Sequence, residues 1–249
     1  MSEQVIEMKE VGEGLIQIKM QDKVHKNTFT NELAGGLIDA FKTVGTKTQY
    51  KVVIFTGFDN YFCSGGTQEA LLSIHDRKSK FTDVDLYSLA LNCPIPVISA
   101  MQGHGIGGGF VIGMFADFVI FSLESIYTTN FMKYGFTPGM GATFILPQKL
   151  GISLAEEMLL SAKTYRGEEL QKRGIPFPVL PREKVMENAF ELAVTLAEKP
   201  RTSLVTLKDH LVAHLRGGLP EVIDQEAAMH EKTFHEPEVR DRIEKLFGK

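Results

Sequence analysis

Two glycine-rich turns contain the residues of this sequence best suited to chemistry. The first, FCSGGT at residues 62–67, and the second, GHGIGGG at residues 103–109, each follow an apolar run and precede an expected helix. Glycines allow a ligand to approach the backbone closely, and amides at a helix start are free to donate. Two amides that converge on one oxygen stabilise an enolate or oxyanion, each typically worth ~2.7 to 4 kcal/mol of barrier. The turns therefore favour an oxyanion hole.

Two other interpretations of these glycines stay open. Gly103-x-Gly105-x-x-Gly108 matches the dinucleotide fingerprint, which would indicate a nicotinamide or flavin cofactor. The match lies in mid-chain, and its helix is cut short before Asp117, so this interpretation is weak. The glycines could also serve only tight packing of helix against strand. Their occurrence at matching places in consecutive units argues against that.

His230 is the first candidate for proton transfer. Ile223, Ala227, His230 and Phe234 share one apolar stripe of a helix, so His230 is expected to face inward. It is either a satisfied core histidine or an imidazole, with an ordinary pKa of ~6.5, that the C-terminal helices bring to a pocket. His235 is expected on the solvent side at a helix start.

Lys80 is the second candidate. It lies in the polar segment 76–85, where Thr82 and Asp85 form a capping-box pattern that predicts the start of a helix. Lys80 is therefore expected to be better ordered than Lys78 and to reach the pocket mouth. A solvated surface role remains the alternative for either lysine.

Composition excludes several other classes of function. The sequence has 27 Lys+Arg and 31 Asp+Glu, a net charge of -4, which gives no basic excess for nucleic acid or anionic membrane. No stretch approaches the ~18 apolar residues of a membrane span, and no targeting segment is recognised at the N-terminus. Cys63 and Cys93 form no disulfide framework, which favours a reducing, cytoplasmic location. His210 and His214 lack further ligands at suitable spacing, so no metal is predicted.

The elements that must position these residues alternate between strand and helix. The 249 residues, 43% of them hydrophobic, suffice for one large domain with or without a helical appendage. Strands are predicted at 13–20, 51–57, 94–100 and 117–122, and a helix after the capping residues 27–30. The pattern is typical of an α/β fold with a largely parallel sheet.

The chain changes character near residue 183. From there apolar residues keep helical spacing to the end, with no strand-like run between them. The segment 166–182 has the least regular pattern and is the expected boundary. We therefore predict an α/β core at 1–182 and a helical region at 183–249.

Taken together, these residues resemble the crotonase superfamily, also called the enoyl-CoA hydratase/isomerase family. The resemblance is carried by Asn27 and by the motifs at 62–66, 94–109 and 134–143. It implies a crotonase-type spiral of β-β-α units. It also implies that the helical C-terminal region forms a homotrimer and covers the active site.

The resemblance also assigns a site. It implies that thioester substrates place their carbonyl oxygen between the backbone amides of Gly66 and Gly108. Hydratases of the family use two glutamates, but the matching positions here hold Val111 and Phe131. Neither can transfer a proton, and each lost acid or base typically removes ~10²- to 10⁴-fold of rate. Hydration is therefore excluded, and an apolar substrate pocket is expected.

Within the family, the sequence is most similar to the decarboxylating homologues of polyketide β-branching cassettes. This similarity implies that a 3-methylglutaconyl group on an acyl carrier protein loses CO₂ to give a 3-methylcrotonyl thioester. Lys80 is then expected to orient the carboxylate and His230 to protonate the dienolate. No metal or redox cofactor is needed.

Two rival functions remain. One is other crotonase chemistry, as an acyl-CoA isomerase or a thioester hydrolase that uses Glu69 or Asp76. The other is a catalytically silent module that binds a carrier protein.

Overall fold

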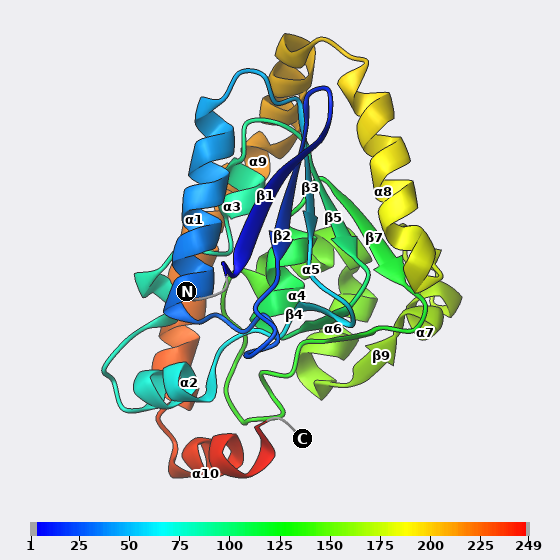
Figure 1. Cartoon of the computed structure of the whole chain (residues 1–249). Helices are drawn as coiled ribbons and strands as arrows, with labels where there is room; N and C mark the ends of the chain where they lie inside the picture. Colours follow the sequence, from blue (N-terminus) through cyan, green and yellow to red (C-terminus); the bar gives the residue numbers. More distant parts are fainter. Residues whose placement is uncertain (1–3, 248–249) are drawn as a thin grey trace.

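A computed structural model describes residues 4–247 of the chain as two β-sheets surrounded by helices (Figure 1). The strands are β1 Ile6–Gly12, β2 Leu15–Met20, β3 Val52–Thr56, β4 Tyr61–Cys63, β5 Val97–Met101, β6 His104–Ile106, β7 Phe118–Ser122, β8 Ile126–Thr128, β9 Thr164–Arg166 and β10 Val179–Leu180. The helices are α1 Asn31–Thr46, α2 Gln68–His75, the 3₁₀ helix η1 Phe81–Asp83, α3 Leu89–Asn92, α4 Gly108–Met114, α5 Ala142–Leu150, α6 Ile152–Ser161, α7 Gly167–Lys172, α8 Arg182–Ala197, α9 Arg201–Thr233 and α10 Pro237–Leu246.

The larger sheet has the strand order β1-β2-β3-β5-β7-β10. Its central strands β2, β3, β5 and β7 are parallel, as predicted, and β3 and β5 are buried at every position. Strands buried on both faces read as continuous apolar runs, which is why their sequences were informative. The first strand of the structure was not predicted from the sequence. It is β1, an antiparallel edge strand with partly exposed residues, rather than the segment 13–20 that forms β2.

The chain repeats one unit three times. Each unit places a strand in the larger sheet, then a strand in the smaller sheet β4-β6-β8-β9, and then a helix. The units are β3-β4-α2, β5-β6-α4 and β7-β8-α5. The spiral of β-β-α units is therefore confirmed. Both glycine turns run from the second strand of a unit toward its helix, which places them at equivalent positions.

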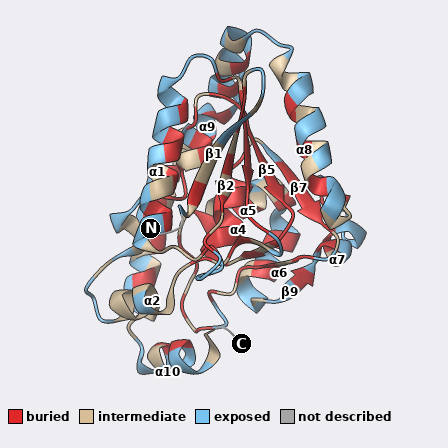
Figure 2. Cartoon of the chain, in the orientation of Figure 1, coloured by how far each residue is buried: buried red, intermediate tan, exposed pale blue. Residues whose placement is uncertain are grey.

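Helices cover both faces of the larger sheet, with α8 on one side and α1 on the other (Figures 1 and 2). Val185, Ala189 and Ala193 of α8 are buried in a cluster with residues of the sheet. The segment 166–182, predicted to be irregular, instead contains α7 and β10, and β10 extends the sheet beside β7. The elements that follow it, up to residue 247, are the helices α8, α9 and α10, and α8 shares the core of the sheet.

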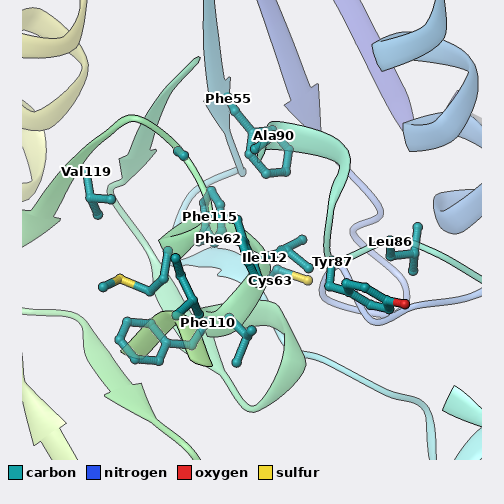
Figure 3. Close-up of a cluster of buried hydrophobic side chains, with 14 of the residues drawn as sticks. Phe55, Phe62, Cys63, Leu86, Tyr87, Ala90, Phe110, Ile112, Phe115 and Val119 are labelled. Atoms are coloured by element: carbon teal, nitrogen blue, oxygen red, sulfur yellow. The ribbon is translucent and has the colours of Figure 1, made fainter. Parts of the chain in front are cut away.

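Helix α4 is buried at all of its residues. Phe110 and Ile112 of α4 lie among Phe55, Phe62 and Cys63 (Figure 3). The rings of Phe55 and Phe62 pack edge to face with centroids 5.2 Å apart. Because this packing leaves little freedom, the turn that begins α4 is held firmly in place.

Helices α9 and α10 return to the segment that follows the first glycine turn. Helix α10 packs against α2 (Figure 1), and α9 contacts η1 in the link that follows α2. No helix within residues 4–247 has the length and apolar character needed to cross a membrane.

Candidate active site

The two glycine turns touch each other. A Cβ on Gly65, whose φ is +78°, would lie 2.7 Å from the Ile106 carbonyl oxygen and 3.4 Å from the Gly108 nitrogen. A Cβ on Gly109 would clash with the Cys63 carbonyl oxygen. Glycine is therefore required on both sides because the backbones meet directly.

The Gly66 and Gly108 amides lie at helix starts and have free N–H groups. Gly66 precedes Thr67, which caps α2 by accepting a hydrogen bond from the Ala70 N–H at 3.0 Å. Gly108 is the first residue of α4. Among the described residues, neither amide donates a hydrogen bond. Two free amides on touching turns are the donors that an oxyanion hole requires.

Asn27 holds the first glycine turn by hydrogen bonds. It is fully buried, and its Nδ2 donates to the Phe62 carbonyl at 2.9 Å. The Cys63 thiol donates to the Asn27 carbonyl at 3.0 Å. Burial raises the pKa of Cys63 to about 12, so this thiol is not a nucleophile at neutral pH.

A cavity of about 360 Å³ lies between the link after α2 and the C-terminal part of α9. It contains both ionisable residues predicted from the sequence, Lys80 and His230. Its other lining residues are Ile74, Arg77, Ser79, Phe81, Ala227, Ala228, Glu231 and His235. The structure thus brings together two residues that lie 150 positions apart in the chain.

His230 is buried with one ring nitrogen unpartnered. Its Nε2 lies 2.8 Å from the Thr137 carbonyl oxygen, which can only accept, so Nε2 carries the hydrogen. The buried Nδ1 has no hydrogen-bond partner among the described residues. The Phe81 ring packs against the imidazole at 4.7 Å between centroids. Burial lowers the pKa of His230 to about 4, so the imidazole is neutral at pH 7.

Lys80 is exposed at the cavity. Its backbone begins a single 3₁₀ turn, where the sequence predicted the start of a helix two residues later. Its N–H donates to the Asp83 carboxylate at 2.7 Å, which closes the single turn of η1. The helix predicted to start at Thr82 is therefore wrong. The Asp83 carboxylate already accepts from the Lys80 N–H, before the predicted helix start. Asp85 accepts from the Ser88 N–H and makes no capping box with Thr82.

Two charged residues near Lys80 in the sequence form an ion pair with each other and not with Lys80. Lys78 pairs with Asp76 at 3.0 Å and does not line the cavity. Hydrogen bonds from Lys78 and then His75 lower the pKa of Asp76 to about 2. Asp76 and Glu69, the carboxylates considered for other crotonase chemistry, are absent from the cavity wall. The cavity therefore favours Lys80 over Lys78.

Two lining residues were missed or misplaced by sequence reasoning. Glu231 is the carboxylate of the cavity wall and pairs with Arg77 at 2.5 Å. His235, expected on the solvent side, is only 17% exposed at its side chain. Its Nδ1 donates to the His75 carbonyl at 2.9 Å, which links the start of α10 to the end of α2. A capping pattern cannot show that two distant helix ends meet.

The family described as Enoyl-CoA hydratase/isomerase matches residues 10–247. The chain belongs to this family.

Among members of the enoyl-CoA hydratase/isomerase family, the chain is 64% identical over 248 residues to the bacillaene synthase decarboxylase PksI of Bacillus subtilis (strain 168), covering 100% of both chains. A structure from a dehydratase/decarboxylase enzyme couple involved in polyketide β-branching is 64% identical, with a TM-score of 0.98 and coverage of 98% of this chain and 100% of that one. The decarboxylase domain of CurF from Lyngbya majuscula is 46% identical, with a TM-score of 0.94 and the same coverage.

The positions matched to the two glutamates of the family's hydratases hold buried apolar residues. Val111 is fully buried in α4, and Phe131 is 8% exposed. The Phe131 and Phe136 rings lie 6.2 Å apart, and Phe136 in turn contacts His230 at 6.0 Å. Neither Val111 nor Phe131 lines the cavity itself, nor do Gly66 and Gly108. This enoyl-CoA hydratase/isomerase family member thus has apolar packing at both positions.

Proposed function

We propose that this protein is a decarboxylase that converts a carrier-bound 3-methylglutaconyl thioester to a 3-methylcrotonyl thioester. The observation that carries the proposal is one cavity holding Lys80 and a buried His230, with Val111 and Phe131 at the hydratase glutamate positions. Its relatives named as decarboxylases support the same chemistry. The other crotonase chemistries lack support because their carboxylates do not line the cavity.

The carbon–carbon bond to the substrate carboxylate breaks in the proposed reaction. Its electron pair delocalises through the double bond onto the thioester oxygen, where the Gly66 and Gly108 amides stabilise the dienolate. The surrounding apolar packing excludes water, which strengthens these hydrogen bonds. CO₂ is the leaving group.

Lys80 orients the substrate carboxylate. Its ammonium group is exposed at the cavity and has no ion pair at 4 Å or less with any residue that the structure describes. A pairing with substrate therefore does not require an internal ion pair to break first.

His230 protonates the dienolate carbon through Nδ1. The Nε2–H remains on the Thr137 carbonyl, which fixes the ring, and Nδ1 is the nitrogen without a partner. The imidazole is neutral in the free enzyme, but a substrate carboxylate beside it favours the charged form. The negative charge persists in the dienolate, so the proton is retained until it is transferred to carbon.

The remaining parts of the proposal concern the setting of the reaction. The dienolate requires only protein donors, so we propose a reaction without metal or redox cofactor. The acyl group is carried on the phosphopantetheine of an acyl carrier protein. We further propose a cytoplasmic homotrimer assembled through residues 183–249.

Incubation of the protein with 3-methylglutaconyl carrier protein tests the proposal. We expect CO₂ release and a 3-methylcrotonyl product by mass spectrometry. An enoyl thioester without a carboxylate should be recovered without addition of water. Hydration of that thioester, or intact 3-methylglutaconyl substrate after prolonged incubation, would refute the proposed function.

A further inference from the structure

One face of α9 holds the turn formed by residues 137–143. Glu226, His230 and Thr233 are spaced i, i+4 and i+7, so they project from the same side of the helix. His230 donates to the Thr137 carbonyl, and Thr233 Oγ1 accepts from the Thr137 N–H at 3.3 Å. The start of the turn is therefore tied to α9 through two side chains.

Glu226 holds the end of the turn. Its side chain is fully buried, yet each carboxylate oxygen is satisfied. The Gly141 N–H donates to Oε2 at 2.7 Å, and the Thr143 N–H and hydroxyl donate to Oε1 at 2.9 and 2.6 Å. These donors stand at the start of α5, where a negative charge is also favoured by the helix dipole.

The same turn contacts both parts of the proposed site. A Cβ on Gly139 would lie 3.0 Å from the Cε1 and Nε2 atoms of His230, so the turn packs against the imidazole. A Cβ on Gly108 would lie 2.5 Å from the Met140 sulfur, so Met140 packs on the second glycine turn. Met140 has a φ of +63°, a left-handed conformation that is uncommon for residues with a side chain. Such a conformation persists only where the surroundings hold it.

We propose that Glu226 is a positioning residue for catalysis, whose buried carboxylate fixes the 137–143 turn and thereby sets both the His230 ring and the Gly108 amide. This inference rests on the proposed function, in which those two groups act on one substrate. Glu226 itself does not line the cavity, and its hydrogen bonds go to Gly141 and Thr143 rather than to the glycine turns. It acts through Gly141 and Thr143 at one end of the turn.

The hydrogen bonds from Gly141 and Thr143 to Glu226, which we call the clamp, require the carboxylate form of Glu226. All three partners of Glu226 are donors, so both oxygens must accept. In Glu226→Gln, one oxygen is replaced by an NH₂ group that faces a donor and cannot accept from it. Thr143→Val removes only the hydroxyl donor and keeps the side-chain shape and the backbone N–H. The two variants therefore weaken the clamp by different amounts.

The test compares these two variants with Val212→Ala, which removes buried volume from α9 but lies 14 positions before Glu226. Decarboxylation kinetics are measured below the unfolding temperature of each variant. A displacement of about 1 Å costs about 10²-fold in rate, so Glu226→Gln should lower kcat by about 10- to 100-fold with little change in KM. Thr143→Val should lower kcat less, and Val212→Ala should leave it near wild type.

A second readout does not depend on activity. The ¹⁵N chemical shifts of the His230 ring report its tautomer and its bond to Thr137. They should change in Glu226→Gln and stay constant in Val212→Ala. An inactive wild type would overturn the proposed function, but the ring shifts would still test the clamp.

The inference is overturned if Glu226→Gln keeps wild-type kcat and wild-type ring shifts. It is also overturned if Val212→Ala loses kcat in the same proportion as Glu226→Gln, since a general loss of stability would then explain both. If Glu226→Gln does not fold, Thr143→Val decides the matter by the same two measurements.

Discussion

The protonation state of His230 gives the sharpest prediction. In the free protein, burial lowers its pKa to about 4, so only about one imidazole in a thousand is charged at pH 7. Protonation of the dienolate by His230 requires the charged form. The substrate must therefore raise the pKa by about 3 units, which at ~1.36 kcal/mol per unit is about 4 kcal/mol.

One substrate carboxylate supplies this energy. Two opposite charges ~4 Å apart at an effective dielectric of ~20 attract each other by about 4 kcal/mol. The buried Nδ1 has no hydrogen-bond partner among the described residues, so an interaction with the substrate carboxylate would displace none. A bound remote carboxylate should therefore raise the pKa of His230 from about 4 to about 7.

The assay is an NMR titration of histidine-labelled protein, with His230→Gln used to assign the signal. The probe is a glutaryl thioester, which has the remote carboxylate but no double bond and so does not decarboxylate. A butyryl thioester, which lacks the carboxylate, is the matched control and should leave the pKa unchanged. A His230 pKa that stays below about 5 with the glutaryl thioester bound would refute its role as proton donor.

Three further predictions concern single side chains. Lys80→Ala should lower kcat/KM by about 10- to 100-fold, the cost of a charged hydrogen bond of about 1.5 to 3 kcal/mol, whereas Lys78→Ala should leave it nearly unchanged; equal losses would exclude the special role of Lys80. Gly108→Ala should lower turnover, because the new Cβ would lie 2.5 Å from the Met140 sulfur and 2.9 Å from the Phe29 ring, so these side chains or the turn must shift; normal kinetics would remove that turn from the mechanism. Because the His230 pKa is lowered to about 4, the unfolded state binds more protons below pH ~6.5, and the protein should lose about 3 kcal/mol of stability as pH falls from 6.5 to 4. His230→Gln should lack this loss when urea unfolding is measured across that range.

Much of the fold could be predicted from the sequence because its signals are local. The runs that form β3, β5 and β7 are mostly apolar, and every residue in them except Phe118 is buried, which is the pattern expected of strands covered on both faces. The helix predicted after Asn27 begins where Thr30 accepts from the Leu33 N–H. β1 was missed because an edge strand with only one buried residue leaves a weaker pattern.

The sequence by itself determined the chemical groups: two glycine turns, an inward histidine, a lysine in a polar link, and no carboxylate at the hydratase positions. The first three follow from residue type or from spacing within one element, and the last follows from the resemblance to the family. Only the tertiary structure decided which groups meet. The approach of α9 to the link after α2 places Lys80 and His230 in one cavity, turns His235 inward, and brings Glu226 to the turn beside Gly108. These contacts join segments far apart in the chain, and their geometry depends on how the whole core packs.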